Sequence, residues 1–275
     1  TSGGTSVVWT HPEGGAWASG ANWDSGTAPN GAGIVPLFGL AITNHATVDT
    51  GAGYTVGGLT FNNDTYGYTL GGNGGLTFAN AGEPSTVSVL AGAHTLKTAL
   101  TAPDGLNITT TDGTQLAFGP DATVAAALTL AQGTLELRGD AAHAGTVDLA
   151  DATLLRARTT TNATIGTLSG TPSSVVALTG TAPALTINQT DDATFAGSFT
   201  GGTDARMTKT GNGTLSLSGL LSPLAGRIAL QSGTLETRSA ALAAAADLAA
   251  AGTLRVAAPA VNGLAGFFYD VTPVT

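Results

Sequence analysis

The feature that most constrains the fold is a short motif that recurs along the chain: a glycine followed by alternating polar and apolar residues, most often Thr-Leu. Its close copies begin at Gly113, Gly133, Gly145, Gly213, Gly233 and Gly252. Successive side chains of a β-strand point to opposite faces. The alternation therefore predicts half-buried strands, with Leu, Val and Phe inward and Thr, Glu, Asp and Arg outward.

The spacing of the motif indicates how these strands are arranged. The steps from Gly113 to Gly133 and from Gly213 through Gly233 to Gly252 are each about 20 residues, which is within the range of solenoid repeats. Further short strands are expected between the copies, at residues 86–90, 127–130, 184–187 and 227–230. We therefore predict an all-β solenoid. Strands this short also suit a β-sandwich or an antiparallel barrel, which stays open as the alternative.

An alanine-rich stretch at residues 240–251 fits this pattern less simply. Alanine has the highest helix propensity, so the stretch could form a short helix. It also falls within one repeat step, between Gly233 and Gly252, where a tight coil could place Leu242 and Leu248 in a narrow core. Both interpretations remain open.

Composition narrows the classes of function. Only 10% of the residues are charged, the net charge is −9, and no Lys or Arg precedes Lys97, so we expect no nucleic-acid partner. The absence of cysteine excludes disulfides and thiolate metal sites and fits an exported protein. No apolar run is long enough to span a membrane. We expect that any signal peptide has been removed from this chain.

Two segments resemble a known family. Residues 207–219 (MTKTGNGTLSLSG), continued by 227–235 (RIALQSGTL), resemble the autotransporter-associated β-strand repeat of bacterial surface proteins. The opening of the chain, with Trp17, Asn22-Trp23-Asp24, Gly26 and Pro29-Asn30, resembles the Trp-rich start that often precedes such repeats, and residues 54–61 resemble the early coils.

The resemblance implies a right-handed parallel β-helix, export to the bacterial cell surface, and a role in adhesion, biofilm or surface architecture without catalytic residues. No translocator domain follows the repeats, so we expect either a fragment of a larger protein or a stand-alone subunit. We divide the chain into a Trp-rich segment or cap (1–33), solenoid repeats (34–260) and an apolar C-terminal strand (261–275).

The two ends of the chain carry the candidate interaction residues. Residues 261–275 could form a final strand on their own stack, a donor strand that adds to a second copy head to tail, or the start of another domain, since 263–269 loosely resemble sugar-binding modules of the PA14 type. The candidate subunit-interface residues are Leu264, Phe267, Phe268, Tyr269, Val271 and Val274. The candidate cap or sugar-platform residues are Trp9, Trp17 and Trp23.

Few residues suggest a catalytic or metal-binding role. The densest charged group is Asp191, Asp192, Asp204, Arg206 and Lys209, which a glycan-cleaving enzyme could use but which we interpret as solvated loop charges. Glu136 and Glu236 are expected to decorate the surface, and the histidines at 11, 45, 94 and 143 to lie in loops or on the surface. We expect no cofactor, although Asp191-Asp192 or Asp148 with Asp151 could hold a structural calcium.

The function that follows from the sequence is structural. We expect a non-enzymatic subunit of an extracellular bacterial fibre or adhesin that self-associates through strand addition at the solenoid ends. Its partners would be further copies of itself and surface glycans or neighbouring cell surfaces. A polysaccharide-binding or polysaccharide-cleaving β-helix is the alternative.

Overall fold

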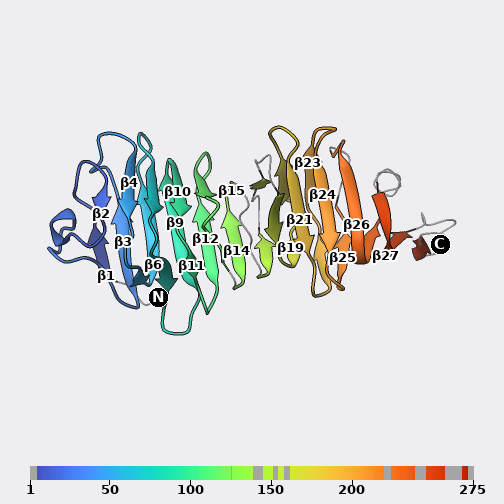
Figure 1. Cartoon of the computed structure of the whole chain (residues 1–275), viewed down its shortest axis with the longest axis horizontal. Coiled ribbons are helices and arrows are strands. Elements are labelled where there is room, and N and C mark those ends of the chain that lie inside the picture. The colour runs from blue at the N-terminus through green and yellow to red at the C-terminus, as the bar shows by residue number, and fades with distance from the viewer. Residues whose placement is uncertain are drawn as a thin grey trace. The chain divides into compact units, whose positions relative to one another are not determined.

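The chain is a right-handed parallel β-helix in which short strands stack in register (Figure 1). The computed structural model describes residues 5–124, 126–138, 145–150, 154–157, 162–219, 224–238, 246–257 and 268–271. Within these ranges the one helix is a single 3-10 turn, η1 (Gly20–Asn22). The chain forms two compact units, Thr1–Gly145 and Thr146–Thr275. The predicted solenoid is thus confirmed, and the sandwich alternative is wrong because the stacked strands pair in parallel.

The first unit has three rows of parallel strands. The first row contains β1 (Thr5–Val8), β3 (Ile34–Phe38), β6 (Gly58–Asn62), β9 (Ser85–Ala91), β12 (Leu106–Thr110) and β14 (Leu128–Gln132). The second row contains β2 (Gly15–Ala16), β4 (Ala46–Asp49), β7 (Tyr68–Gly71), β10 (Ala93–Lys97), β13 (Gln115–Phe118) and β15 (Thr134–Leu137). The third row contains β5 (Tyr54–Val56), β8 (Leu76–Phe78) and β11 (Leu100–Thr101).

The second unit repeats this plan. Its first row contains β16 (Val147–Leu149), β19 (Leu168–Gly170), β22 (Ala193–Phe195), β25 (Thr214–Leu217) and the end of β26 (Arg227–Thr237). Its second row contains β17 (Leu154–Ala157), β20 (Val175–Leu178) and β23 (Ser198–Gly201). Its third row contains β18 (Asn162–Ile165), β21 (Ala184–Asn188), β24 (Arg206–Thr210) and the start of β26, and β27 (Ala246–Ala257) pairs along β26.

The glycine motif precedes strands that stack directly on one another, as the register shows. Leu215 lies opposite Leu235, and Leu235 lies opposite Leu254, so one repeat step is one coil. All three leucines are no more than 2% exposed. Burying one leucine side chain contributes about 1.5–3 kcal/mol. A ladder of inward leucines therefore holds the coils together.

The alanine-rich stretch forms a strand where the structure describes it. Residues 246–251 belong to β27, which pairs in parallel with β26, so a helix over these residues is wrong. The helix advantage of alanine is well under 1 kcal/mol per residue over most residues. Backbone pairing with the preceding coil outweighs it. The rest of the stretch, 240–245, lies outside the described residues.

Candidate functional site

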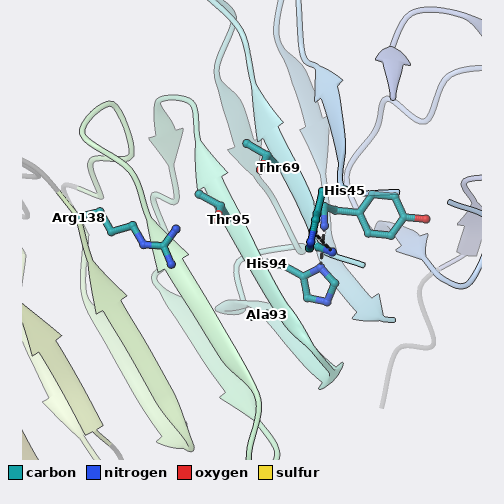
Figure 2. Close-up of a pocket in the computed structure, with 8 residues that line it drawn as sticks. His45, Thr69, Ala93, His94, Thr95 and Arg138 are labelled. Carbon is teal, nitrogen blue, oxygen red and sulfur yellow. Dashed lines mark hydrogen bonds between the residues drawn. The ribbon is translucent and has the colours of Figure 1, made fainter. Parts of the chain in front are cut away.

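A polar groove lies on the second row of the first unit (Figure 2). Its volume is about 370 Å³, and it is lined by His45, Gly67, Tyr68, Thr69, Ala93, His94, Thr95 and Arg138. Thr69 and Thr95 lie opposite each other on β7 and β10, and both point outward between inward neighbours. Two threonine side chains on neighbouring coils therefore lie on the same face of the row and line the groove.

Beneath the groove, Tyr68 and His94 face the core. The Tyr68 amide donates a hydrogen bond to His94 Nδ1 (3.1 Å), and His94 Nε2 donates to the Ala91 carbonyl oxygen (2.8 Å), which fixes the tautomer. The His94 ring stacks on Phe61, with 4.7 Å between ring centroids. Burial lowers the pKa of His94, opposed by its bond to Ala91, so the imidazole is neutral in the folded protein at pH 7.

His94 was expected in a loop or on the surface, and that prediction is wrong: it is 1% exposed. The alternation in β10 carried the signal, because His94 shares a face with the buried Leu96. Tyr68 is equally part of the core, and its hydroxyl donates to the Gly39 carbonyl oxygen (2.8 Å). Burial raises the pKa of Tyr68 to about 12.

One wall of the groove is Arg138, which Figure 2 shows extending across the sheet toward Thr95. Its Nε and Nη2 atoms lie 2.8 and 2.6 Å from Glu136 Oε2, and Gln115 donates to the same oxygen. Glu136 is 1% exposed. It occupies the outward position predicted for it, but it does not decorate the surface, because Arg138 and Gln115 bind its carboxylate.

The opposite wall is His45, which is exposed. Its Nδ1 accepts a hydrogen bond from the Gly67 amide (2.9 Å), so its proton lies on Nε2. Its ring packs edge-on against Tyr66, with 6.0 Å between centroids. The groove thus combines hydroxyls, an imidazole N–H and a guanidinium that is already paired with a carboxylate.

The second unit brings together only part of the charged group predicted from sequence. Asp192 lines a groove of about 280 Å³ with Thr194, Thr214, Ser216, Glu236 and Arg255. Asp192 Oδ1 accepts a hydrogen bond from the Thr214 amide (2.6 Å), and this bond lowers the pKa of Asp192. Asp204 instead accepts from the Ala182 amide (2.8 Å). A carboxyl with a lowered pKa is unsuited to act as the general acid of a glycosidase.

Lys209 is not a solvated loop charge. It is fully buried on the inward side of β24, between Ile187 and Leu230 in the register. Its ammonium donates to the carbonyl oxygens of Thr210 (3.1 Å), Gly211 (2.8 Å) and Ser232 (3.0 Å), which belong to two neighbouring coils. Desolvation lowers its pKa to about 8, opposed by the charge of Asp192.

The three tryptophans pack together in the first unit. Trp9 and Trp17 are fully buried and Trp23 is 3% exposed, and the Trp23 ring lies 5.0 and 4.9 Å from the other two. Each indole N–H donates to a backbone carbonyl oxygen of residue 11, 29 or 17. Buried rings with satisfied donors fill the core rather than form an open platform for a sugar.

The same N-terminal segment covers the edge of the first row. Asp24 donates its amide to the Val8 carbonyl oxygen (2.9 Å), and the Val8 amide donates to Asp24 Oδ1 (2.9 Å). Trp9 and Trp23 form an antiparallel bridge beside this pair. The backbone N–H and C=O of Val8, which could otherwise pair with a further strand, are therefore used within the chain.

The C-terminal candidates are described only in part. Phe268, Tyr269 and Val271 lie in β28 (Phe268–Val271), which pairs antiparallel with β27, Leu254 lying opposite Val271. Leu264, Phe267 and Val274 lie outside the described residues. At this edge the strand is thus folded back on its own chain.

Comparisons with protein-family models, curated proteins and solved structures find no match.

Within the described part of the chain, no group of three or more His, Asp or Glu residues could hold a metal ion. Asp148 accepts from the Ser169 hydroxyl (2.6 Å), and Asp151 and His143 lie outside the described residues. No helix among the described residues is long and apolar enough to cross a membrane.

Proposed function

We propose that the protein is a non-catalytic structural element of an extracellular bacterial fibre or adhesin. The observation that carries the proposal is the uninterrupted parallel stacking of coils within each unit, since hydrogen bonds between successive coils resist extension along the stack. Threonine ladders such as Thr55–Thr77–Thr101 and Thr164–Thr186–Thr208 give the outer faces a polar surface with little charge. Such faces repel each other weakly and suit dense lateral packing.

The resemblance of residues 207–219 to the autotransporter-associated repeat supports the same role and supports export. The absence of cysteine is consistent with export. The lowered pKa of Asp192 makes this carboxyl unsuited to the general-acid role that glycan hydrolysis requires.

We place self-association at the C-terminal strand. A four-residue antiparallel ladder holds β28 to β27, and the same bonds could form with β27 of a second copy. Head-to-tail addition at the other edge would first have to break the bonds between Val8 and Asp24. An exchange at β28 would instead form again, with the second copy, the same bonds that it breaks.

The test compares the wild-type chain with a chain that lacks residues 262–275, by light scattering after gel filtration and by negative-stain microscopy. We expect assemblies from the wild type and monomers from the deletion. A Leu40→Ser variant is the control, because Leu40 is 75% exposed and lies far from β28 in the sequence. It should assemble like the wild type. Assemblies of unchanged size from the deletion would refute strand exchange.

A further inference from the structure

The hydroxyls of the first-unit groove have no partner within the described part of the chain. Thr69 and Thr95 are half-buried on β7 and β10 and make no hydrogen bond to another described residue. Nearby threonines behave differently: Thr50 and Thr98 are buried, their hydroxyls lie 3.2 Å apart, and each bonds to a backbone carbonyl oxygen. The groove thus offers two hydroxyls whose hydrogen-bonding capacity is unused.

The charged side chains beside these hydroxyls, Arg138 and Glu136, are already paired with each other. The carboxylate of Glu136 is bound to two nitrogens of Arg138, so an anionic ligand would have to compete with it. The guanidinium has five N–H groups, which leaves donors beyond those that Glu136 occupies. His45 adds its Nε2–H on the opposite wall. A ligand with many hydroxyls and no charge fits this set better than an acidic one.

The geometry also favours an extended ligand. Neighbouring strands lie about 4.8 Å apart, so the threonine side chains repeat at that interval along the stack, close to the advance of one pyranose ring in an extended polysaccharide. The row continues on the N-terminal side, because Thr47 lies opposite Thr69. The volume of about 370 Å³ falls within the range of ligand pockets.

We propose that this groove binds a neutral polysaccharide, laid along the stack with its hydroxyls bonded to Thr69 and Thr95 and its sides flanked by His45 and Arg138 (Figure 2). The proposal goes beyond the structural role and does not depend on it, since a monomer would bind equally well.

Affinity gel electrophoresis with xyloglucan, laminarin or dextran, and with alginate as the acidic probe, tests the proposal. The wild-type chain should be retarded by at least one neutral polymer and not by alginate alone. A double Thr69→Val, Thr95→Val variant should bind about 25-fold more weakly, because each hydroxyl hydrogen bond contributes roughly a factor of five. Valine keeps the shape and the strand propensity of threonine.

The matched control is Thr55→Val with Thr77→Val. These two threonines are also half-buried and lie opposite each other, but on the third row, outside the groove. The control should bind like the wild type. Thr95→Tyr, which fills the groove with a ring, should abolish binding. No retardation by any neutral polymer, retardation by alginate alone, or equal weakening in the two double variants would each overturn the proposal.

Discussion

Replacement of Lys209 by methionine should change how stability depends on pH. The chain contains two lysines, Lys97 and Lys209. Lys97 is exposed, whereas Lys209 is fully buried with its ammonium bonded to three carbonyl oxygens. Desolvation holds its pKa at about 8 in the folded protein, against 10.5 in the unfolded chain. At pH values between about 8 and 10.5, Lys209 therefore carries a proton in the unfolded chain but not in the folded protein.

The sign follows from this difference in bound protons. Stability rises with pH wherever the unfolded state binds more protons, so the contribution of Lys209 increases from about pH 8 to about pH 10.5. One pKa unit corresponds to about 1.4 kcal/mol, so the full rise is roughly 3 kcal/mol. This is an upper limit, because the three carbonyl oxygens favour the charged form.

Urea unfolding of the wild type, Lys209→Met and Lys97→Met between pH 7 and 10.5 measures the effect. The wild type and Lys97→Met should show the same rise in the free energy of unfolding, and Lys209→Met should lack the part that Lys209 contributes. An unchanged pH dependence in Lys209→Met would refute the reasoning. So would a Lys209-dependent fall in stability across this range.

Three further predictions follow from the contacts, each measured by denaturant unfolding. Gly233→Ala should destabilise by more than Gly113→Ala, because both glycines have positive φ (+69° and +78°) but only a Cβ at Gly233 meets neighbours, with the backbone carbonyl oxygens of Gly211 and Gly213 within 2.7 Å. Trp17→Ala should cost about 3–5 kcal/mol and Leu40→Ala less than about 0.5 kcal/mol, since only the first side chain is buried. The wild-type protein should lose stability as the pH falls below 6.5, because the pKa of His94 is lowered in the folded state and the unfolded chain therefore takes up the proton first. The His94→Phe variant should lack this loss, and an equal loss in both proteins would contradict the prediction.

The strands and coils could be predicted because their signals are local. The Gly-Thr-Leu motif shows where the chain turns, which side chains of the strand face inward and how long one repeat is. The structure places Gly233 opposite Gly252, as the spacing of the motif predicts. The buried Lys209 and His94 were missed although the same alternation shows them. Lys209 stands two residues after the inward Met207, but a charged residue there was assigned to the surface on residue type alone.

The groove could not be predicted, because it depends on contacts between coils. Thr69 and Thr95 are 26 residues apart and become neighbours only through a coil longer than the 20-residue repeat. Arg138, the residue that follows β15, reaches the groove because Glu136 binds its guanidinium. The sequence alone shows neither the register of the longer coils nor the burial of Glu136 by Arg138 and Gln115.

The most direct test of the account is a disulfide engineered between coils. The chain has no cysteine, and Ser216 lies opposite Glu236 on the outward face of adjacent coils. Adjacent strands bring two Cα atoms within the range that a disulfide spans. Ser216→Cys with Glu236→Cys should form an intramolecular bond under mild oxidation, whereas Ser216→Cys with Arg227→Cys should not. The opposite result, with no bond in the first pair and a bond in the second, would contradict the stacked 20-residue coils.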